Sequence, residues 1–240
     1  MHFSIQKIYI GDFMEQTTIG TYNEKTIHSL LKKRYEPNEN FHEIRYKNYI
    51  ADIKNGSSIY EIQSAQFYRM RDKIKAFTED DNELTIVFPI PHEKNIVWVD
   101  PDTGESSTPR RSPKKGSEYN IFNEIYTIRD MISNPRLGFI AILMDIIEYR
   151  YLSSRKNRKD GAKRAERIPV RIVKEVRIKE KRDYSDLIPE NIGKEFTVKE
   201  FAAAAKIPAS RAQKTIYIMR LTGSVALKGK SGRKYVYKRN

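Results

Sequence analysis

The segment that most constrains the fold of this chain is a short hairpin centred on Asn55-Gly56. Residues 50–64 read IADIKNGSSIYEIQS, so two runs rich in Ile and Tyr flank the Asn-Gly pair. Asn-Gly favours a tight hairpin turn because both residues tolerate positive φ angles. If residues 55–58 form the loop, Asp52 lies opposite Glu61, and a two-residue loop keeps both on the same face. The sequence therefore predicts two antiparallel strands that bring two carboxylates together.

Two carboxylates that face each other across a sheet repel, and this repulsion indicates a counter-ion. Mg²⁺ (or Mn²⁺) removes the penalty, since it is held by one or two carboxylates together with phosphate oxygens of a substrate. The hairpin thus predicts half of a metal site for phosphodiester chemistry. The alternative is that Asp52 and Glu61 are two solvated residues on an exposed sheet face.

The pattern around the hairpin predicts an α/β domain in which helices flank a mixed sheet. An apolar stripe from Ile27 to Tyr35 indicates a helix that ends near Pro37. A helix after Gln63 can act as a crossover that makes the following strand parallel to the second hairpin strand. The ranges expected to be strands are 41–53, 58–64, 84–90 and 95–100, and those expected to be helices are 66–77, 119–132 and 137–152.

Positive charge gathers in two segments of a chain whose formal net charge is +14. Residues 150–182 hold 14 Lys and Arg against 4 Asp and Glu, and residues 201–240 hold 10 Lys and Arg with no acid. The rest of the chain is therefore net negative. An acidic body with two basic segments indicates binding to a polyanion, above all nucleic acid, although a basic balance can also serve solubility alone. Residues 153–182 are predicted to be a basic linker with one strand at 168–176.

The C-terminal segment, residues 183–240, predicts two helices followed by a basic hairpin. Thr197 and Glu200 form a capping box that opens a helix over 198–206, and a second helix over 211–221 stops at Gly223. A hairpin with a Gly/Ser tip follows at 225–237. Helix, turn, helix and basic hairpin resemble the winged-helix family of DNA-binding domains, which implies a recognition helix and a backbone-contacting hairpin, or, in a minority of cases, protein contacts.

The residues expected to contact DNA come from three places. In the loop after residue 108 they surround a Ser-Pro-Lys-Lys sequence that resembles a short turn of histone tails, and the alternative for this segment is a solvated loop. On the second helix they include Arg and Gln, which read base edges, and on the hairpin they are cations that hold phosphates. The candidates are Arg110, Arg111, Lys114, Lys115, Ser210, Arg211, Gln213, Lys214, Tyr217, Lys228, Lys230, Arg233 and Lys234.

Asp52, Glu61 and Gln63, with a helix before and after them, resemble the PD-(D/E)XK nuclease superfamily. The resemblance covers about residues 20–100 and implies a restriction-endonuclease-like fold in which these residues surround Mg²⁺. It also implies a carboxylate on the preceding helix, for which Glu24 is the candidate, although Thr21 and Glu24 also fit a capping box. In this chain Ala51 stands where the superfamily has Pro.

Gln63 stands where the superfamily has Lys, and this departure bears on activity. The Lys orients the attacking water and offsets charge on the phosphate, whereas Gln can only hydrogen-bond the water. A substitute cation can come from the next helix or from the basic loop. The candidates are Arg69, Arg71, Lys73, Lys114 and Lys115.

These features together predict a Mg²⁺-dependent DNA endonuclease: a nuclease-like domain over 1–152, the basic linker over 153–182 and the winged-helix domain over 183–240. The first rival is a catalytically inactive DNA-binding protein, such as a regulator or mobile-element maintenance factor, and the second is an RNA-directed protein. A homodimer is compatible with cutting both strands. With no cysteine and no apolar run long enough to span a bilayer, a cytoplasmic protein without a membrane partner is expected.

Overall fold

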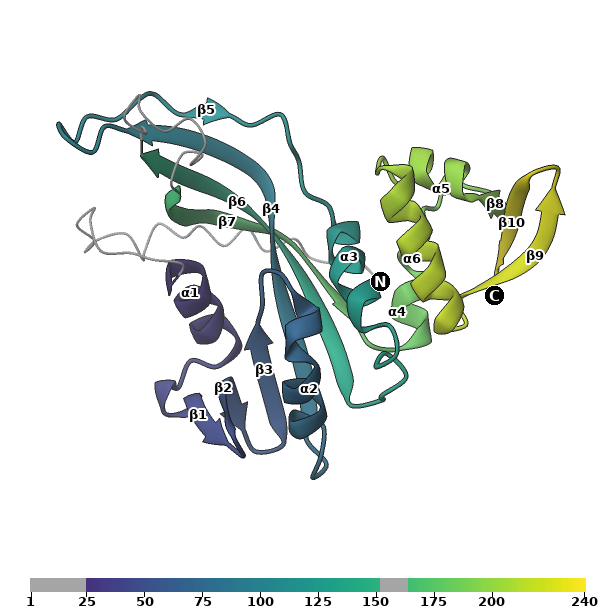
Figure 1. Cartoon of the computed structure of the whole chain (residues 1–240), viewed down its shortest axis with the longest axis horizontal. Helices are drawn as coiled ribbons and strands as arrows, with labels where there is room; N and C mark the ends of the chain where they lie inside the picture. Colours follow the sequence, from purple (N-terminus) through teal and green to yellow (C-terminus); the bar gives the residue numbers. More distant parts are fainter. Residues whose placement is uncertain (1–24, 152–163) are drawn as a thin grey trace. The chain divides into compact units, whose positions relative to one another are not determined.

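The computed structural model in Figure 1 describes residues 25–151 and 164–240. The described residues fall into two compact units. The first contains 25–42, 89–117, 142–151 and 164–175, and the second contains 43–88, 118–141 and 176–240. The second unit thus groups the predicted winged-helix segment with the hairpin at Asn55-Gly56.

A large mixed sheet is built from seven strands, of which six follow the order β1-β2-β3-β4-β6-β7 while β5 pairs with β4. The strands are β1 (His42–Tyr46), β2 (Tyr49–Asn55), β3 (Ser58–Ile62), β4 (Glu83–Val99), β5 (Arg110–Arg111), β6 (Leu137–Tyr151) and β7 (Arg164–Ile178). The α-helices of the same part of the chain are α1 (Lys25–Tyr35), α2 (Arg71–Phe77) and α3 (Phe122–Ile125). The short 3₁₀ turns are η2 (Glu39–Phe41), η3 (Phe67–Met70), η4 (Glu118–Ile121) and η5 (Tyr126–Ile128). The predicted α/β class with a mixed sheet and flanking helices is confirmed.

The predicted hairpin and its crossover are both present in the second unit. Asn55 lies opposite Ser58 and Lys54 opposite Ile59, which is the register predicted for a loop over 55–58. Gly56 carries the positive φ of 56° that the turn requires. After α2, β4 runs parallel to β3, so the helix between them acts as the predicted crossover.

Two predicted strand boundaries were wrong. The single strand expected over 41–53 is interrupted at Lys47, whose φ is 52°, so β1 and β2 are separate strands joined by a tight turn. The two strands expected at 84–90 and 95–100 are one continuous strand, β4. Pro89 and Pro91 are two residues apart, so their missing N–H groups face the same side, and the opposite edge of β4 keeps its hydrogen bonds.

The helix predicted over 137–152 was wrong, because this segment is the strand β6. Its sequence, LGFIAILMDIIEYRY, is an apolar run whose first eight residues are all buried. A strand covered on both faces has no polar alternation, so periodicity cannot distinguish it from a buried helix. The helix expected over 119–132 is three short helical turns, η4, α3 and η5, over 118–128.

The basic segment expected to be a linker contributes a strand. The strand predicted at 168–176 is present as the longer β7, which pairs with β6 in the large sheet. Of the predicted linker, residues 153–163 lie outside the described residues. In the first unit, Arg34 of α1 forms an ion pair of 3.1 Å with Glu175 of β7, so the basic segment is held by α1.

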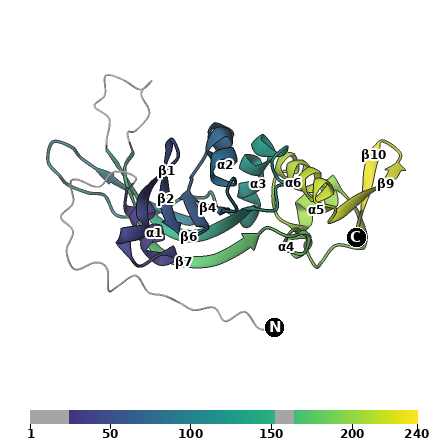
Figure 2. The same ribbon diagram turned by 90° about the horizontal axis from the view of Figure 1, so that it is seen from below.

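The C-terminal elements agree closely with the predicted pattern, and Figure 2 shows α5 and α6 beside the hairpin. They are α4 (Lys181–Ser185), β8 (Glu195–Thr197), α5 (Val198–Ala204), α6 (Ala209–Leu221), β9 (Val225–Ser231) and β10 (Lys234–Arg239). The capping box of Thr197 and Glu200 opens α5 as expected. These strands form a separate sheet in the order β8-β10-β9.

Aromatic side chains join this C-terminal part to the rest of the second unit. Phe122 of α3 lies 6.4 Å from the ring of Tyr184, and Tyr119 of η4 lies 5.8 Å from the ring of Phe201. The hydroxyl of Tyr119 donates a 2.7 Å hydrogen bond to the carbonyl of Leu187. All four rings are buried, so the turns over 118–128 and the C-terminal helices share one core.

Candidate active site

The hairpin brings the two predicted carboxylates together by reciprocal hydrogen bonds. The backbone N–H of Asp52 donates to Oε1 of Glu61 at 3.1 Å, and the N–H of Ile62 donates to Oδ2 of Asp52 at 2.7 Å. Each carboxylate is therefore held by the backbone of the opposite strand. This arrangement follows from the register. Ile53 and Tyr60 are direct partners, and Asp52 and Glu61 are the next residues of the two strands in the direction away from the turn.

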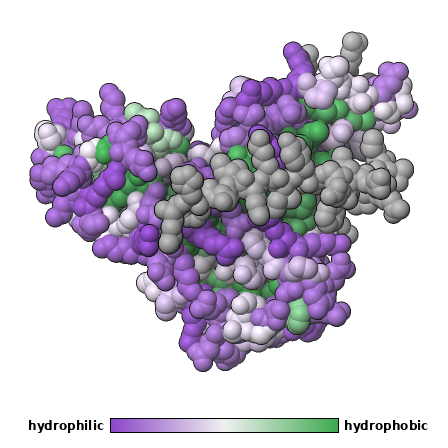
Figure 3. Space-filling view, turned by 180° about the vertical axis from the view of Figure 1, so that it is seen from behind, coloured by the Kyte–Doolittle hydropathy of each residue, from purple (hydrophilic) through white to green (hydrophobic). Residues whose placement is uncertain are grey.

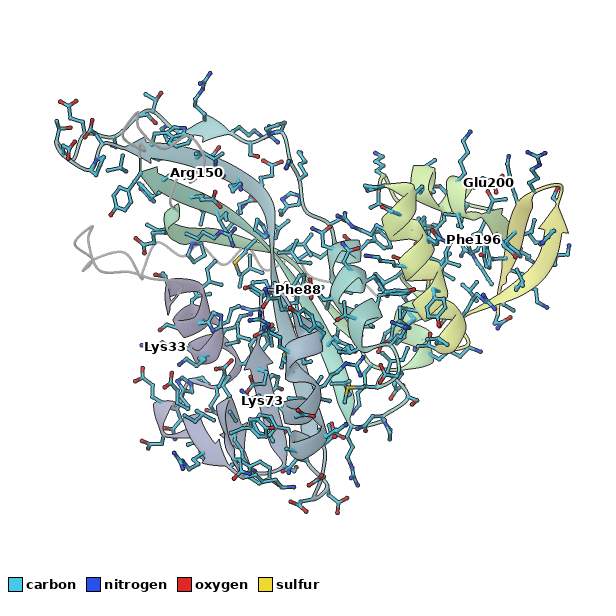
Figure 4. The ribbon with its side chains drawn as sticks, in the orientation of Figure 1. Lys33, Lys73, Phe88, Arg150, Phe196 and Glu200 are labelled. Carbon is cyan, nitrogen blue, oxygen red and sulfur yellow. The ribbon has the colours of Figure 1, made fainter. Side chains whose placement is uncertain are left out.

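Lys73 of α2 supplies a positive charge to the same place (Figure 4). Its Nζ donates to Oε2 of Glu61 at 2.7 Å, and it also lies 5.2 Å from the ring centroid of Phe77. α2 is amphipathic at this point, since Ile74 and Phe77 are fully buried while Lys75 is exposed. The crossover helix thus anchors its apolar face and directs Lys73 to the hairpin.

Glu61 is buried, and its environment changes its ionisation. Only 4% of the residue is exposed. Burial, and then the nearby Asp52 carboxylate, raise the pKa of Glu61 to about 7, while Lys73 opposes this shift. Desolvation and like charge both disfavour an ionised carboxylate, and an adjacent ammonium favours it. Near neutral pH, a further cation at this position would therefore shift Glu61 to its ionised form.

Gln63 lies on β3, two residues after Glu61, but its side-chain amide is engaged locally. Its Nε2 donates to the carbonyl of Ala65, and its backbone N–H donates to the carbonyl of Val87 at 2.9 Å. In this conformation the Gln63 amide stabilises the chain after β3. Its predicted role in positioning water stays a prediction.

Of the five candidate substitute cations, Lys73 is the one that contacts a predicted ligand. Arg71 is bidentate to Asp130 of the segment after η5, and Arg69 donates to the hydroxyl of Tyr68. In the first unit, Lys115 pairs with Glu93, and Lys114 is exposed. Sequence reasoning named Lys73 without being able to rank it, because the rank depends on the side of α2 that faces β3.

The metal-ligating set contains two described carboxylates. Glu24, the predicted third ligand, lies outside the described residues. Among residues 25–151 and 164–240, no group of three or more His, Cys, Asp and Glu side chains is arranged to hold a metal ion. Within the same residues, the hydrogen bond that the Asp52 carboxylate accepts comes from the N–H of Ile62 and goes to Oδ2, while Oδ1 accepts none. This oxygen is the acceptor that remains for a ligand.

The basic loop of the first unit is partly neutralised. Arg111 of β5 forms an ion pair with Glu93, which also binds Lys115. Arg110 is exposed on the same short strand, and Lys114 is exposed in the loop after it. Arg110 and Lys114 therefore keep more of their charge for a polyanion than Arg111 and Lys115 do.

The predicted recognition helix, α6, presents its DNA-binding candidates in two directions. Lys214 donates to Oδ1 of Asn123 at 3.3 Å, and the ring of Tyr217 packs edge-on against Tyr126 at 5.3 Å. Both partners belong to the turns over 118–128. By contrast, Ser210 and Gln213 are exposed, while Arg211 is partly buried.

The predicted hairpin cations lie on β9, β10 and the turn between them. Lys228 pairs with Glu195 at 2.5 Å. The other three, Lys230, Arg233 and Lys234, are exposed, as is Tyr235 with 49% of its surface accessible. Tyr235 is not among the residues predicted from the sequence, which on this hairpin are all cations, because its exposure depends on how far the hairpin extends beyond the core.

Most of the visible surface in Figure 3 is hydrophilic, in agreement with a content of 32% charged residues. Among the described residues, no helix combines the length and the apolar character needed to cross a membrane. The chain's DNA and dimer partners, and its cytoplasmic location, stay predictions.

Comparisons with known proteins give a family but no activity. A family model described as "Domain of unknown function (DUF8091)" matches residues 25–179, which include Asp52, Glu61 and Lys73 and stop before α4. A protein of Treponema pallidum (strain Nichols) called "Uncharacterized protein" is 27% identical over 122 residues, or 50% of this chain and 48% of the relative. The chain thus aligns with about half the length of that relative. No solved structure matches the chain. Because the matched region covers more than half of its residues, the chain belongs to the family described as "Domain of unknown function (DUF8091)".

Proposed function

We propose that the protein is a Mg²⁺-dependent DNA endonuclease that hydrolyses phosphodiester bonds at Asp52 and Glu61. The observation that carries the proposal is the convergence of these two carboxylates, from paired strands, beside the ammonium of Lys73. A helix precedes the hairpin and a crossover helix follows it. This is the setting that the resemblance to the PD-(D/E)XK nuclease superfamily implies.

The carboxylate pair is chemically suited to a hard divalent cation. Mg²⁺ takes one or two carboxylates and completes its shell with water and substrate phosphate oxygens, so a two-carboxylate site is sufficient. Oδ1 of Asp52 is available, and Oε2 of Glu61 is already bound to a cation, Lys73. Bound there, Mg²⁺ would supply Lewis-acid polarisation of the phosphodiester.

Lys73 takes the role that Gln63 leaves open. The superfamily position carries Lys, whereas here the Gln63 amide binds the carbonyl of Ala65. Lys73 reaches the same carboxylate from α2. Once a metal ion shares Glu61, the Lys73 ammonium can offset negative charge on the phosphate, which is the electrostatic contribution that phosphoryl transfer needs.

The C-terminal sheet and helices are proposed to be a winged-helix DNA-binding domain. The order α4, β8, α5, α6, β9, β10 places two helices before a basic hairpin, and β8 pairs with β10. The segment 201–240 carries ten basic residues and no acid. This charge supports affinity for a polyanion, which is the sequence-independent part of DNA binding.

A catalytically inactive DNA-binding protein is the second candidate, and one observation favours it. Glu61 is 4% exposed, and both of its oxygens are bound within the chain, one by Asp52 and one by Lys73. Such a buried pair can be structural alone. In that case the nuclease-like part stabilises the fold and the basic C-terminal segment carries the function.

The test is cleavage of supercoiled plasmid in Mg²⁺ or Mn²⁺, compared with EDTA. Asp52→Asn and Lys73→Met are expected to reduce nicking by roughly a hundredfold, the usual cost of removing one group that stabilises transition-state charge. Lys75→Met, on the exposed side of the same helix, is the matched control and should keep full activity. Absence of metal-dependent cleavage by the wild type, or full activity of Asp52→Asn, would remove the nuclease proposal and leave the DNA binder.

Two further parts of the proposal have direct tests. Competition between duplex DNA, single-stranded DNA and RNA at one salt concentration separates a DNA-directed from an RNA-directed protein, because charge alone does not discriminate them. Sedimentation equilibrium tests the proposed homodimer, which would supply two active sites for cutting both strands.

A further inference from the structure

The C-terminal hairpin, β9 and β10, carries exposed apolar surface as well as charge. Tyr235 is 49% exposed and Leu227 is 41% exposed. Tyr237, two residues further along β10, is buried, so Tyr235 lies on the part of the strand near the turn that extends beyond the core. Gly232, with a φ of 60°, makes the tight turn between the strands. The ring of Tyr235 is therefore accessible to a ligand from solvent.

Tyr235 is paired with a cation across the two strands. Lys230 is its direct partner in the register, and the Nζ of Lys230 lies 5.0 Å from the centroid of the Tyr235 ring. A cation near one aromatic ring orders that ring and adds positive charge beside it. Surfaces that bind single-stranded nucleic acid combine these two features, a basic track for phosphates and an aromatic ring on which a base stacks.

The charge on this hairpin is available to a ligand. Lys230, Arg233 and Lys234 are exposed, and among the described residues none of the three forms an ion pair within 4 Å, although Lys234 is close enough to Glu200 to lower the pKa of that carboxyl. Lys228 of β9 differs, because it pairs with Glu195 of β8, which lies on the other side of β10. The free cations therefore cluster near the turn and around Tyr235.

The corresponding face of α6 is less available. Lys214 is bonded to Asn123, and Tyr217 packs on Tyr126. These contacts attach one side of α6 to the turns over 118–128 within the same unit, and leave Ser210 and Gln213 as the exposed candidates near its start. Tyr217 is 37% exposed, but its ring already packs on Tyr126, whereas the more exposed ring of Tyr235 on the hairpin has only the Lys230 ammonium beside it among the described residues.

We propose that the β9–β10 hairpin, and not α6, makes the main nucleic-acid contact, and that Tyr235 stacks on an unpaired base next to a duplex. The inference rests on the nucleic-acid-binding part of the proposed function. It names the substrate class, a duplex with a single-stranded end or gap, because a base offers its face to a side chain only where it has left the stack. Lys230, Arg233 and Lys234 then bind the phosphates on either side.

The experiment measures binding of the full-length protein to fluorescein-labelled duplexes in EDTA, so that cleavage does not contribute. One duplex is blunt and the other has a short 3′ or 5′ overhang that contains 2-aminopurine, whose fluorescence is quenched by stacking. Wild type is expected to prefer the overhang and to quench it. Tyr235→Ala should lose roughly tenfold in affinity for the overhang and most of the quenching, while Tyr235→Phe keeps both.

Two control variants test whether α6, and not the hairpin, makes the main nucleic-acid contact. Leu221→Ala removes an exposed apolar side chain from the end of α6 and should bind like wild type, as should the double variant Ser210→Ala/Gln213→Ala. The inference is overturned if Tyr235→Ala binds the overhanging duplex with normal affinity, or if Tyr235→Phe binds it as weakly as Tyr235→Ala does. It is also overturned if Tyr235→Ala loses the same affinity for blunt and overhanging duplexes, or if the α6 double variant loses affinity for the overhanging duplex.

Failure of this inference and failure of the nuclease proposal have different signatures. If Tyr235 governs binding in EDTA but no metal-dependent cleavage occurs, the hairpin assignment stands and the enzyme assignment does not. If cleavage depends on Asp52 while Tyr235→Ala binds normally, the reverse holds. Circular dichroism melting of each variant checks that the fold is kept.

Discussion

The ammonium of Lys73 lies 2.7 Å from Oε2 of Glu61, a carboxylate that is 4% exposed and has Asp52 beside it. This contact places a cation where two carboxylates from paired strands meet. In the absence of a metal ion it lowers the repulsion between them. It also identifies Lys73 as the side chain that must rearrange or share Glu61 when a divalent ion binds.

We expect Lys73→Met to destabilise the protein by on the order of 3 kcal/mol at pH 8, because removal of one partner leaves a buried carboxylate uncompensated. Urea unfolding measures this difference. The double variant Lys73→Met/Glu61→Gln should recover most of the loss, since no buried charge remains. Lys75→Met, which is exposed on the same helix, is the control; an equal loss in Lys75→Met would contradict the pairing.

The stability of the protein should depend on pH through Glu61. Its pKa is about 7 in the folded state and near 4.5 in the unfolded chain, so the folded state binds the proton more tightly. The contribution of Glu61 to the free energy of unfolding is therefore greatest below pH 4.5. It decreases by on the order of 3 kcal/mol as pH rises from 4.5 to 7. Melting temperatures of wild type and Glu61→Gln between pH 5 and 8.5 test this, and equal slopes for the two proteins would disprove it.

Divalent metal binding should strengthen as pH rises through 7. A metal ion needs Glu61 ionised, whereas burial and Asp52 favour its protonated form at lower pH. We expect 10 mM Mg²⁺ or 1 mM Mn²⁺ to raise the melting temperature clearly at pH 8 and only slightly at pH 5.5. Asp52→Asn should abolish the shift at both values, and a shift that persists in this variant would place the ion elsewhere.

A second buried carboxylate, Glu148 in the first unit, should give the stability of the protein the opposite pH dependence. Burial alone would raise its pKa, but hydrogen bonds from Arg150 and Arg167, together with Lys94, hold the pKa at about 2. Glu148 is fully buried, so this pairing stabilises the fold above pH 4.5, and the contribution is lost as pH falls from 4.5 towards 2.

Glu148→Gln should therefore cost about 3 kcal/mol at pH 7 and about 1 kcal/mol at pH 2.5, because below pH 4.5 the unfolded chain holds a proton on Glu148 that folding must release. Urea unfolding at pH 7 and at the lowest pH that keeps the protein folded provides the comparison. Glu105→Gln, an exposed residue of the same unit, is the control. A pH-independent effect of Glu148→Gln would show that packing, and not charge, explains the residue.

The local features of the fold that could be predicted are those with a strong short-range signal. The Asn55-Gly56 turn fixed the hairpin register, and with it the meeting of Asp52 and Glu61. Thr197 and Glu200 located the start of α5, and Gly223 located the end of α6. In each case a side chain or a positive φ acts on its own backbone, so distant residues are not needed for the inference.

Features that depend on tertiary packing could not be predicted in the same way. The apolar sequence of β6 is compatible with a buried helix or a buried strand, and it forms a strand because it pairs with β4 and β7 on either side. The side of α2 that faces β3 decides that Lys73, and not Arg69 or Arg71, reaches Glu61. The attachment of α6 through Lys214 and Tyr217 depends on Asn123 and Tyr126, which lie more than 90 residues earlier.

A crystal structure of the protein soaked in Mn²⁺ at pH 8, with anomalous data collected at the manganese edge, would show whether Asp52 and Glu61 hold a divalent ion. We expect an anomalous peak within coordination distance of Oδ1 of Asp52 and of the Glu61 carboxylate, with the Lys73 ammonium either displaced from Glu61 or sharing this carboxylate with the metal ion. A map with no peak at this position, and Lys73 still bound to Glu61, would contradict this expectation.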